Sequence, residues 1–218
     1  MVQVSASLLA ADFARLGQEV VRAERAGVNS FHFDMMDGHY VPNLALAPDH
    51  LSALRPYTTL PFHVHLELAN PDEVLEHFRP LTAKLIIVCR NTLDHPEATF
   101  ARIRAAGAKA GLSLNPDEPI EKIYPLLPEL DLLMIMGVFP GFGGQSLDPA
   151  SMARIAQARQ MRADGATDLL IAVDGGVNLE NAPALVKAGA DVLIIGTALF
   201  RAHPMSSFIS TLREAVEA

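Results

Sequence analysis

The sequence lacks several features that mark whole classes of protein. Its 218 residues include one cysteine, Cys89, which excludes an internal disulfide and suits a reducing compartment. It has no basic run and a net charge of −8, which argues against nucleic-acid binding. No stretch approaches the roughly 20 apolar residues of a membrane span, and the N-terminus lacks the pattern of a secretory signal. We therefore expect a cytoplasmic protein with no nucleic-acid or membrane partner.

What the sequence does contain is a regular alternation of apolar runs and helical patterns. Nearly all-apolar strands are typical of parallel strands covered by helices. No segment rich in Pro, Gly or Ser divides the chain, so we expect one domain over residues 1–218. Eight units in this length favour a closed (βα)8 TIM barrel over the alternative, a doubly wound sheet. The expected strands lie in VQVSAS, VNSFHFD, PFHVHLEL, AKLIIVC, AKAGLSL, LDLLMIM, DLLIAVD and ADVLIIG. The expected helices cover Asp12–Ala26, Pro48–Leu54, Asn70–Phe78, His95–Ala106, Pro119–Leu127, Pro149–Ala163, Asn178–Ala188 and Pro204–Val216.

Four ionisable residues lie on three of these strands. They are His32 and Asp34 in FHFDMMDG, His65 in PFHVHLEL and Asp174 in LLIAVDGG. Side chains alternate between the faces of a strand, so His32 and Asp34 share one face while the adjacent phenylalanines take the other. Active sites of TIM barrels lie at the C-terminal ends of the strands, so the four residues should converge. Two His and two Asp make a plausible divalent-metal shell, and the two carboxylates can also transfer protons.

Glycine-containing loops follow the sixth, seventh and eighth expected strands. Glycine lets backbone N–H groups approach an anion closely, and TIM barrels commonly bind phosphate in the loops after strands seven and eight. The last two loops carry no Lys or Arg, so backbone amides would hold a phosphate there. A flexible loop and tight turns are the alternative interpretation. The candidate substrate-contacting residues are Gly141, Phe142, Gly143, Gly144, Gly175, Gly176, Gly196 and Thr197.

Three further residues, together with His65, are candidates for substrate contact. Ser7 ends the first expected strand, where it could hydrogen-bond a substrate hydroxyl or form a solvated strand end. Met36 and Met136 lie next to the expected metal site and could exclude water from the reacting carbon, although methionine more often fills a core.

At these residues the chain resembles the ribulose-phosphate 3-epimerase family. HxDxMDGxxxPN, which begins at His32, PGFGGQ and VDGGVN carry the resemblance, which extends over nearly the whole chain. It implies metal-dependent epimerisation at carbon 3 of a ketose phosphate, D-ribulose 5-phosphate to D-xylulose 5-phosphate in the pentose phosphate pathway, through an enediolate. It places the metal ligands on His32, Asp34, His65 and Asp174, the acid/base residues on Asp34 and Asp174, and substrate contacts on Ser7 and the glycine loops. It also implies one divalent ion per subunit, commonly Zn²⁺ with Fe²⁺, Mn²⁺ or Co²⁺ as alternatives, and a homo-oligomer.

The chain departs from the family pattern on the third and fourth strands. The family usually has methionine at the position of Glu67, and His followed by Glu where this chain has Cys89-Arg90-Asn91. Glu67 shares a strand face with His65, about 7 Å farther along. It could hydrogen-bond a substrate hydroxyl, pair with Arg90, or lie in water at the rim. Substrate contact would fit an enzyme adapted to another ketose phosphate, such as D-allulose 6-phosphate.

Further expectations concern His63 and the alternative functional classes. His63, one layer below His65, is expected to be a hydrogen-bonded core residue rather than a further ligand. A catalytically silent barrel that only binds sugar phosphate is the alternative from a different functional class. A decarboxylase is disfavoured, because no Asp-x-Lys-x-x-Asp occurs.

Overall fold

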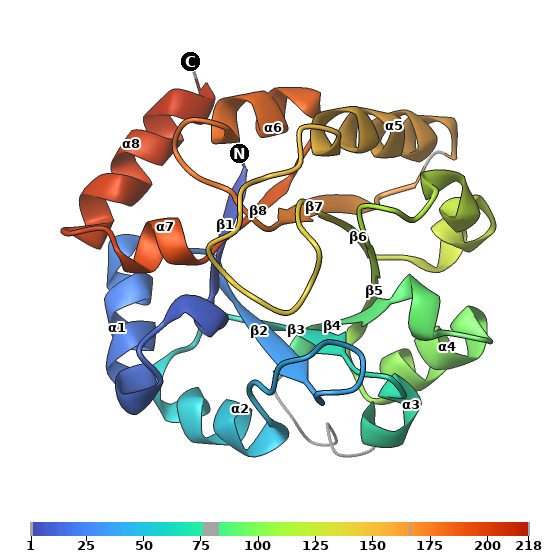
Figure 1. The fold of residues 1–218 in the computed structure, drawn as a ribbon, viewed down its shortest axis with the longest axis horizontal. Coiled ribbons are helices and arrows are strands. Elements are labelled where there is room, and N and C mark those ends of the chain that lie inside the picture. The colour runs from blue at the N-terminus through green and yellow to red at the C-terminus, as the bar shows by residue number, and fades with distance from the viewer. Residues whose placement is uncertain (1, 76–82, 166, 218) are drawn as a thin grey trace.

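Eight parallel strands close into a barrel in the order of the sequence, with β8 pairing β1. The computed structural model describes residues 2–75, 83–165 and 167–217. Figure 1 looks down the barrel and shows the ring of strands surrounded by helices, which confirms the expected TIM barrel. The strands are β1 (Gln3–Ser7), β2 (Ser30–Met36), β3 (Phe62–Glu67), β4 (Ala83–Cys89), β5 (Lys109–Leu114), β6 (Leu132–Met136), β7 (Leu170–Asp174) and β8 (Val192–Ile195).

The connections between strands are mostly α-helical. The α-helices are α1 (Leu16–Ala26), α2 (Pro48–Leu54), α3 (Pro71–Val74), α4 (Pro96–Ala105), α5 (Ser151–Asp164), α6 (Ala182–Ala188), α7 (Thr197–Phe200) and α8 (Met205–Glu217). Segments of 3-10 helix cover Leu8–Ala10, Phe13–Arg15, Arg55–Tyr57, Arg90–Thr92 and Ile120–Glu129. None of the helices within the described ranges is both long enough and apolar enough to cross a membrane.

Some helices differ from the sequence prediction. The segment after β5 is a 3-10 helix, because Pro125 and Pro128 remove backbone donors and their rings would clash within an α-helix. Helix α6 begins only at Ala182, since the Asn178 side chain accepts hydrogen bonds from the N–H groups of Glu180 and Asn181 just before it. Of the helix expected over Asn70–Phe78, Pro71–Val74 is helical, and residues 76–78 lie outside the described residues.

Two apolar clusters divide the interior. The larger one lies between the strands and the helices and includes Phe31, Phe33 and Phe62, which are fully buried. The smaller one fills the inside of the barrel with Leu85, Ile87, Leu132, Met134, Met136, Ala172, Val192 and Ile194. The expected alternation on β2 is therefore confirmed: its phenylalanines face the helices, and the side chains between them face the barrel axis.

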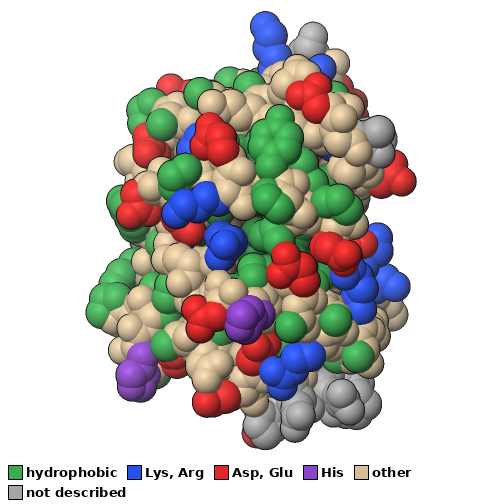
Figure 2. All heavy atoms as spheres, turned by 90° about the vertical axis from the view of Figure 1, so that its right-hand side faces the viewer, with side chains coloured by type: hydrophobic (Ala, Val, Ile, Leu, Met, Phe, Trp, Pro, Cys, Tyr) green, Lys and Arg blue, Asp and Glu red, His purple; other side chains and the backbone are tan. Residues whose placement is uncertain are grey.

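The C-terminal ends of the strands form the barrel mouth, and the loop between β6 and α5 lies across it. In Figure 1 this loop, residues 137–150, passes in front of the ring. On the outer face in Figure 2, by contrast, acidic, basic and hydrophobic side chains are interspersed. The barrel mouth is thus where the fold gathers the polar residues that the sequence singled out.

Candidate active site

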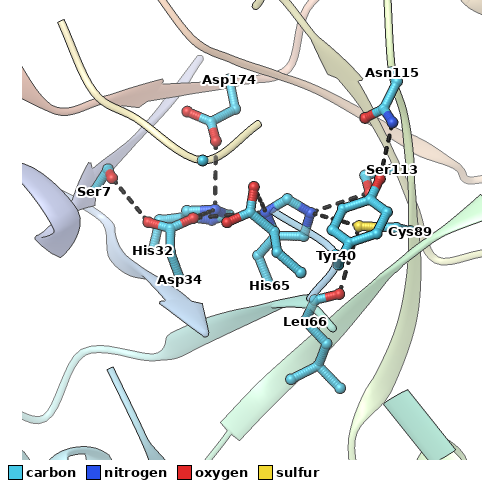
Figure 3. A network of polar contacts seen from close by, with 12 residues as sticks. Ser7, His32, Asp34, Tyr40, His65, Leu66, Cys89, Ser113, Asn115 and Asp174 are labelled. Carbon is cyan, nitrogen blue, oxygen red and sulfur yellow. Dashed lines mark hydrogen bonds and ion pairs between the residues drawn. The ribbon is translucent and has the colours of Figure 1, made fainter. Parts of the chain in front are cut away.

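Four side chains from three strands meet at the barrel mouth. His32 and Asp34 come from β2, His65 from β3 and Asp174 from β7, and one ligand atom of each lies within 4.8 Å of the others. His32 Nε2 is 3.0 Å from Asp34 Oδ1 and 3.6 Å from Asp174 Oδ2. His65 Nδ1 is 3.6 Å from Asp34 Oδ1. Figure 3 shows the two imidazoles and the two carboxylates turned toward one another.

Strand register produces this convergence. Asp34 pairs with His65 across β2 and β3, and both side chains point into the barrel. Ser7 pairs with His32 across β1 and β2, and its hydroxyl donates to Asp34 Oδ2 at 3.1 Å. Asp174 is the last residue of β7 and reaches the same point from the other side of the ring. Alternation and register alone therefore bring together residues up to 142 positions apart, from His32 to Asp174.

Contacts of Nε2 hold the His65 ring on the side away from Asp34. Its Nε2 lies 3.1 Å from Ser113 Oγ and 3.6 Å from Cys89 Sγ. Ser113 donates its own hydrogen to the carbonyl of Val88, so its oxygen is free to accept the Nε2–H of His65. In the neutral ring, Nδ1 then carries a lone pair aimed at the Asp34 carboxylate. A second ring nitrogen held in this way is typical of metal-binding histidines.

The cluster has the chemistry of a divalent-metal site. His32 and His65 are fully buried, and both nitrogens of His32 and Nδ1 of His65 lack hydrogen-bond partners among the described residues. These buried nitrogen atoms have lost water as a partner and gained no hydrogen bond, so the arrangement costs free energy as it stands. A cation held by these atoms would remove that cost. Imidazole and carboxylate are ligands that Zn²⁺, Fe²⁺, Mn²⁺ and Co²⁺ accept, so the residues fit such an ion.

The two aspartates differ in proton affinity. Burial is the largest influence on Asp34, but attraction to His32 and His65 outweighs it and lowers its pKa. Burial, opposed by His32 and reinforced by the Asp34 charge, raises the pKa of Asp174 to about 6. Burial would lower the pKa of His32, yet the two carboxylates raise it, whereas burial dominates and lowers the pKa of His65. One carboxyl group is thus held ionised, and its neighbour gains a proton more readily.

A cavity of about 370 Å³ opens above the cluster. Asp34 and Asp174 line it, whereas His32 lies outside its lining. His65, which the sequence also marked for substrate contact, lies outside the lining as well. The other residues that the sequence marked for substrate contact all line this cavity: Ser7, Met36, Glu67, Met136, Gly141, Phe142, Gly143, Gly144, Gly175, Gly176, Gly196 and Thr197.

The glycine loops approach one another at one end of this cavity. Gly176 has φ 72°, and a Cβ there would lie 2.8 Å from Leu147 Cα. A Cβ on Gly143 or Gly144 would lie 3.6 or 3.7 Å from Thr197 Oγ1. The loops after β6, β7 and β8 therefore meet in a concave surface rich in backbone N–H groups, which is a form that binds phosphate.

Arg201 is a cavity residue that was not among those predicted from the sequence. It lines the same cavity as Gly196 and Thr197, and it is the one arginine among the lining residues. A signal was available, because Arg201 follows Thr197 by four positions, which places both on one side of a helical turn. Arg201 thus adds a basic residue to a surface where the sequence indicated backbone amides alone.

A second missed feature is a polar network centred on Tyr40, in the loop after β2. Tyr40 donates to Asn91 Oδ1 at 2.9 Å and accepts a hydrogen bond from Asn115 Nδ2 at 2.8 Å. In the same loop, Asn43 Nδ2 donates to the carbonyl of Gly141 at 2.7 Å, which ties this loop to the one across the mouth. The unusual Asn91 thus takes part in fixing the loops of the site (Figure 3 shows Tyr40 and Asn115).

Glu67 and His63 differ from expectation. Glu67 is only 2% exposed, so the interpretation that it lies in water at the rim is wrong. Arg90 donates to the carbonyl of Leu93, and no ion pair joins it to Glu67 among the described residues. His63 lies below the cluster in register with His32 but makes no hydrogen bond within the described ranges, so the expected hydrogen-bonded role is wrong.

Comparison with known proteins decides the family. The sequence profile described as "Ribulose-phosphate 3 epimerase family" matches residues 3–200. The chain belongs to the ribulose-phosphate 3-epimerase family. It is 40% identical to the Ribulose-phosphate 3-epimerase of Bacillus subtilis, over 98% of this chain and 99% of that protein. It is 38% identical to the Ribulose-phosphate 3-epimerase of Methanocaldococcus jannaschii, over 99% of this chain and 91% of that protein. The chain is accordingly an enzyme of the isomerase class.

Among solved structures, the fold also resembles that of more distant barrels. Orotidine 5'-phosphate decarboxylase from Pyrococcus horikoshii OT3 superposes with a TM-score of 0.71 at 15% identity, over 99% of this chain and 100% of that chain. At this identity the likeness concerns the fold alone.

Proposed function

We propose that this epimerase inverts carbon 3 of D-ribulose 5-phosphate to give D-xylulose 5-phosphate, and that it depends on a divalent metal. The observation that carries the proposal is the meeting of two carboxylates from opposite parts of the ring, Asp34 and Asp174, in one metal-type cluster at the cavity floor. Removal of a proton from one side of a carbon and its return to the other side requires a group on each side.

The chain's own residues then have distinct roles. Asp34, held by Ser7 and beside both imidazoles, accepts the carbon 3 proton in one direction, and Asp174 supplies a proton from the other strand. The roles exchange in the reverse direction. His32, Asp34, His65 and Asp174 would hold the cation, which supplies Lewis-acid stabilisation of the negative charge of the enediolate. Met36 and Met136 line the cavity beside these groups and exclude water from the reacting carbon.

The opposite end of the substrate is its phosphate. We assign it to the concave surface formed by the loops after β6, β7 and β8, with Arg201 as its counter-charge. Backbone N–H groups and a guanidinium form charge-assisted hydrogen bonds with phosphate oxygens. This placement leaves the ketose carbons over the carboxylates.

Incubation of the ketose phosphate in D₂O tests the proposal directly. Deuterium should enter carbon 3, as followed by NMR, while the epimer appears. Purified protein should contain about one divalent ion per chain, which we expect to be Zn²⁺, with Fe²⁺, Mn²⁺ or Co²⁺ as the other ions that the ligands fit. A sugar-phosphate-binding barrel without catalysis would bind the ketose phosphate and leave carbon 3 unlabelled.

A different ketose phosphate, such as D-allulose 6-phosphate, is the second candidate, and buried Glu67 in the cavity is the observation behind it. The extra carbon of a six-carbon substrate lies between carbon 3 and the phosphate, whereas Glu67 lies at the end of β3, away from the β7 and β8 loops. We therefore place the five-carbon substrate first. A panel of ketose phosphates assayed with wild type and Glu67→Met compares the two, and unchanged selectivity in the variant would remove Glu67 as an argument for the second.

Our proposal also includes a cytoplasmic location and a homo-oligomeric state. Fractionation of cells and light scattering on the purified protein measure the two properties. A membrane-bound or secreted protein, or a monomer at all concentrations, would contradict them.

A further inference from the structure

Glu67 occupies an unusual position for a carboxyl group. It is the last residue of β3, it points into the barrel in register with Met36, and it lines the cavity while being 2% exposed. Its Oε1 lies 4.0 Å from His65 Nδ1, and its Oε2 has no hydrogen-bond partner among the described residues. A buried polar atom without a partner costs about 1–3 kcal/mol, so such atoms in native proteins call for an explanation.

The surroundings of Glu67 do not supply that partner. The Gly141 N–H bonds the Glu67 carboxyl group, and the nearby carboxyl groups of Asp34 and Asp174 offer it only like charge. Met36 and Met136 contribute apolar walls to the same cavity. The free carboxyl oxygen of Glu67 is therefore a polar point beside the apolar walls that Met36 and Met136 give the cavity.

The fold places Glu67 at a defined end of the substrate. In an eight-stranded ring, β3 lies opposite β7, and the proposed phosphate site lies where Gly143 and Gly144 of the β6 loop approach Thr197 after β8. Gly141 of the same loop lies at the other end, beside Glu67. The function proposed above puts the reacting carbon between these two ends, over Asp34 and Asp174, which belong to one cluster. A ketose phosphate with its phosphate on the glycine loops therefore extends its other end, which carries the carbon 1 hydroxyl, toward Glu67.

We propose, on the basis of the function proposed above, that Glu67 is a specificity-determining residue whose carboxyl group hydrogen-bonds the carbon 1 hydroxyl of the ketose phosphate. A hydroxyl donates to a carboxylate and accepts from a carboxylic acid, so the contact forms in either state of Glu67. A site built to bond a hydroxyl rejects the analogue that lacks it, because its own polar group is then left without a partner. The chain should thus select ketoses with an oxygen on carbon 1.

An alternative role for Glu67 is that of a fifth metal ligand. The four clustered residues offer ligand atoms that are all mutually within 4.8 Å, and Glu67 is not among them. The metal content of a Glu67 variant separates the two roles, because a substrate-contacting residue leaves the bound ion in place.

The test compares D-xylulose 5-phosphate with 1-deoxy-D-xylulose 5-phosphate, which lacks only the carbon 1 hydroxyl. Deuterium entry at carbon 3 gives kcat/KM for each compound with wild type, Glu67→Gln and Glu67→Met. Glu97→Met makes the same chemical change on the exposed face of α4 and serves as the matched control. The ratio of the two kcat/KM values within each protein cancels general losses of activity. Comparison of this ratio between wild type and the variants then isolates the contact of Glu67 with the carbon 1 hydroxyl.

We expect wild type and Glu97→Met to prefer the parent compound by about 10- to 100-fold, as one hydrogen bond to a carboxyl group implies. Glu67→Gln should keep most of this preference, and Glu67→Met should reduce it to about threefold or less with unchanged metal content. Each of three outcomes would overturn the inference: an unchanged ratio in Glu67→Met, loss of the metal from that variant, or a wild-type ratio near one. The last outcome is measured on wild type alone, so it does not depend on whether a variant folds. If wild type labelled neither compound, the proposed function itself would be refuted and the inference with it.

Discussion

Substitution of Gly176 by alanine should lower stability and weaken substrate binding by more than backbone strain at this position alone would cause. Gly176 has φ 72°, and an L-residue in that region costs about 1–2 kcal/mol. An added Cβ would lie 2.8 Å from Leu147 Cα and 2.9 Å from the carbonyl carbon of Ser146, and nearer still to Leu147 N. These are backbone atoms of the loop across the mouth, so they must move, which adds about 1–3 kcal/mol as for overpacking elsewhere.

Gly107 offers a matched control for this prediction. It has φ 85°, lies after α4 away from the cavity, and has nothing within 4 Å of an added Cβ. Gly107→Ala should therefore lower the free energy of unfolding by about 1–2 kcal/mol and leave KM unchanged. Gly176→Ala should be less stable than this and should raise both KM for the ketose phosphate and the inhibition constant for inorganic phosphate about tenfold or more. Urea unfolding and steady-state kinetics measure the two effects. Equal KM values in the two variants would refute the assignment of this loop to phosphate binding.

Four further substitutions test other parts of the site. Replacement of Asp34 or Asp174 by Asn should lower kcat by about 10²- to 10⁴-fold, as for loss of a general acid or base, and wild-type turnover in either variant would contradict the two-aspartate mechanism. Arg201→Ala should raise KM several-fold with kcat retained, and an unchanged KM would exclude Arg201 from phosphate binding. Burial and His32 lower the pKa of His63 to about 4. As the pH falls below about 6.5, the unfolded chain therefore binds a proton at His63 that the folded chain does not bind. Stability should fall by about 2 kcal/mol between about pH 7.5 and pH 5, and a His63→Asn variant with the same fall in urea titrations would contradict this origin.

The sequence predicted the barrel and its cluster because both depend on local patterns. Apolar strands between capped helices repeat along the whole chain, and alternation along β2 and β3 determines which side chains face the axis. Once the strands close in order, Asp34 must lie beside His65, as the register shows. Residues at strand ends thus carry most of the information about the site.

What the sequence did not reveal depends on loops and on distances across the barrel. The solvation of Glu67 follows from how the loop containing Gly141 covers the end of β3, which no local pattern specifies. The part of Arg201 in the cavity depends on the turn of α7, and the contacts of Tyr40 depend on how three loops meet. The 3-10 segment after β5 was in principle predictable, since Pro125 and Pro128 both lie within it.

Titration of the chelator-treated enzyme with Zn²⁺ tests the central claim most directly, with deuterium entry at carbon 3 of D-ribulose 5-phosphate as the readout. His32, Asp34, His65 and Asp174 form one cluster, so the rate should begin near zero, rise in proportion to the added ion, and level off at one ion per chain. Full exchange by protein stripped of metal, or a plateau at any other ratio, would contradict a single cation site that acts with two aspartates.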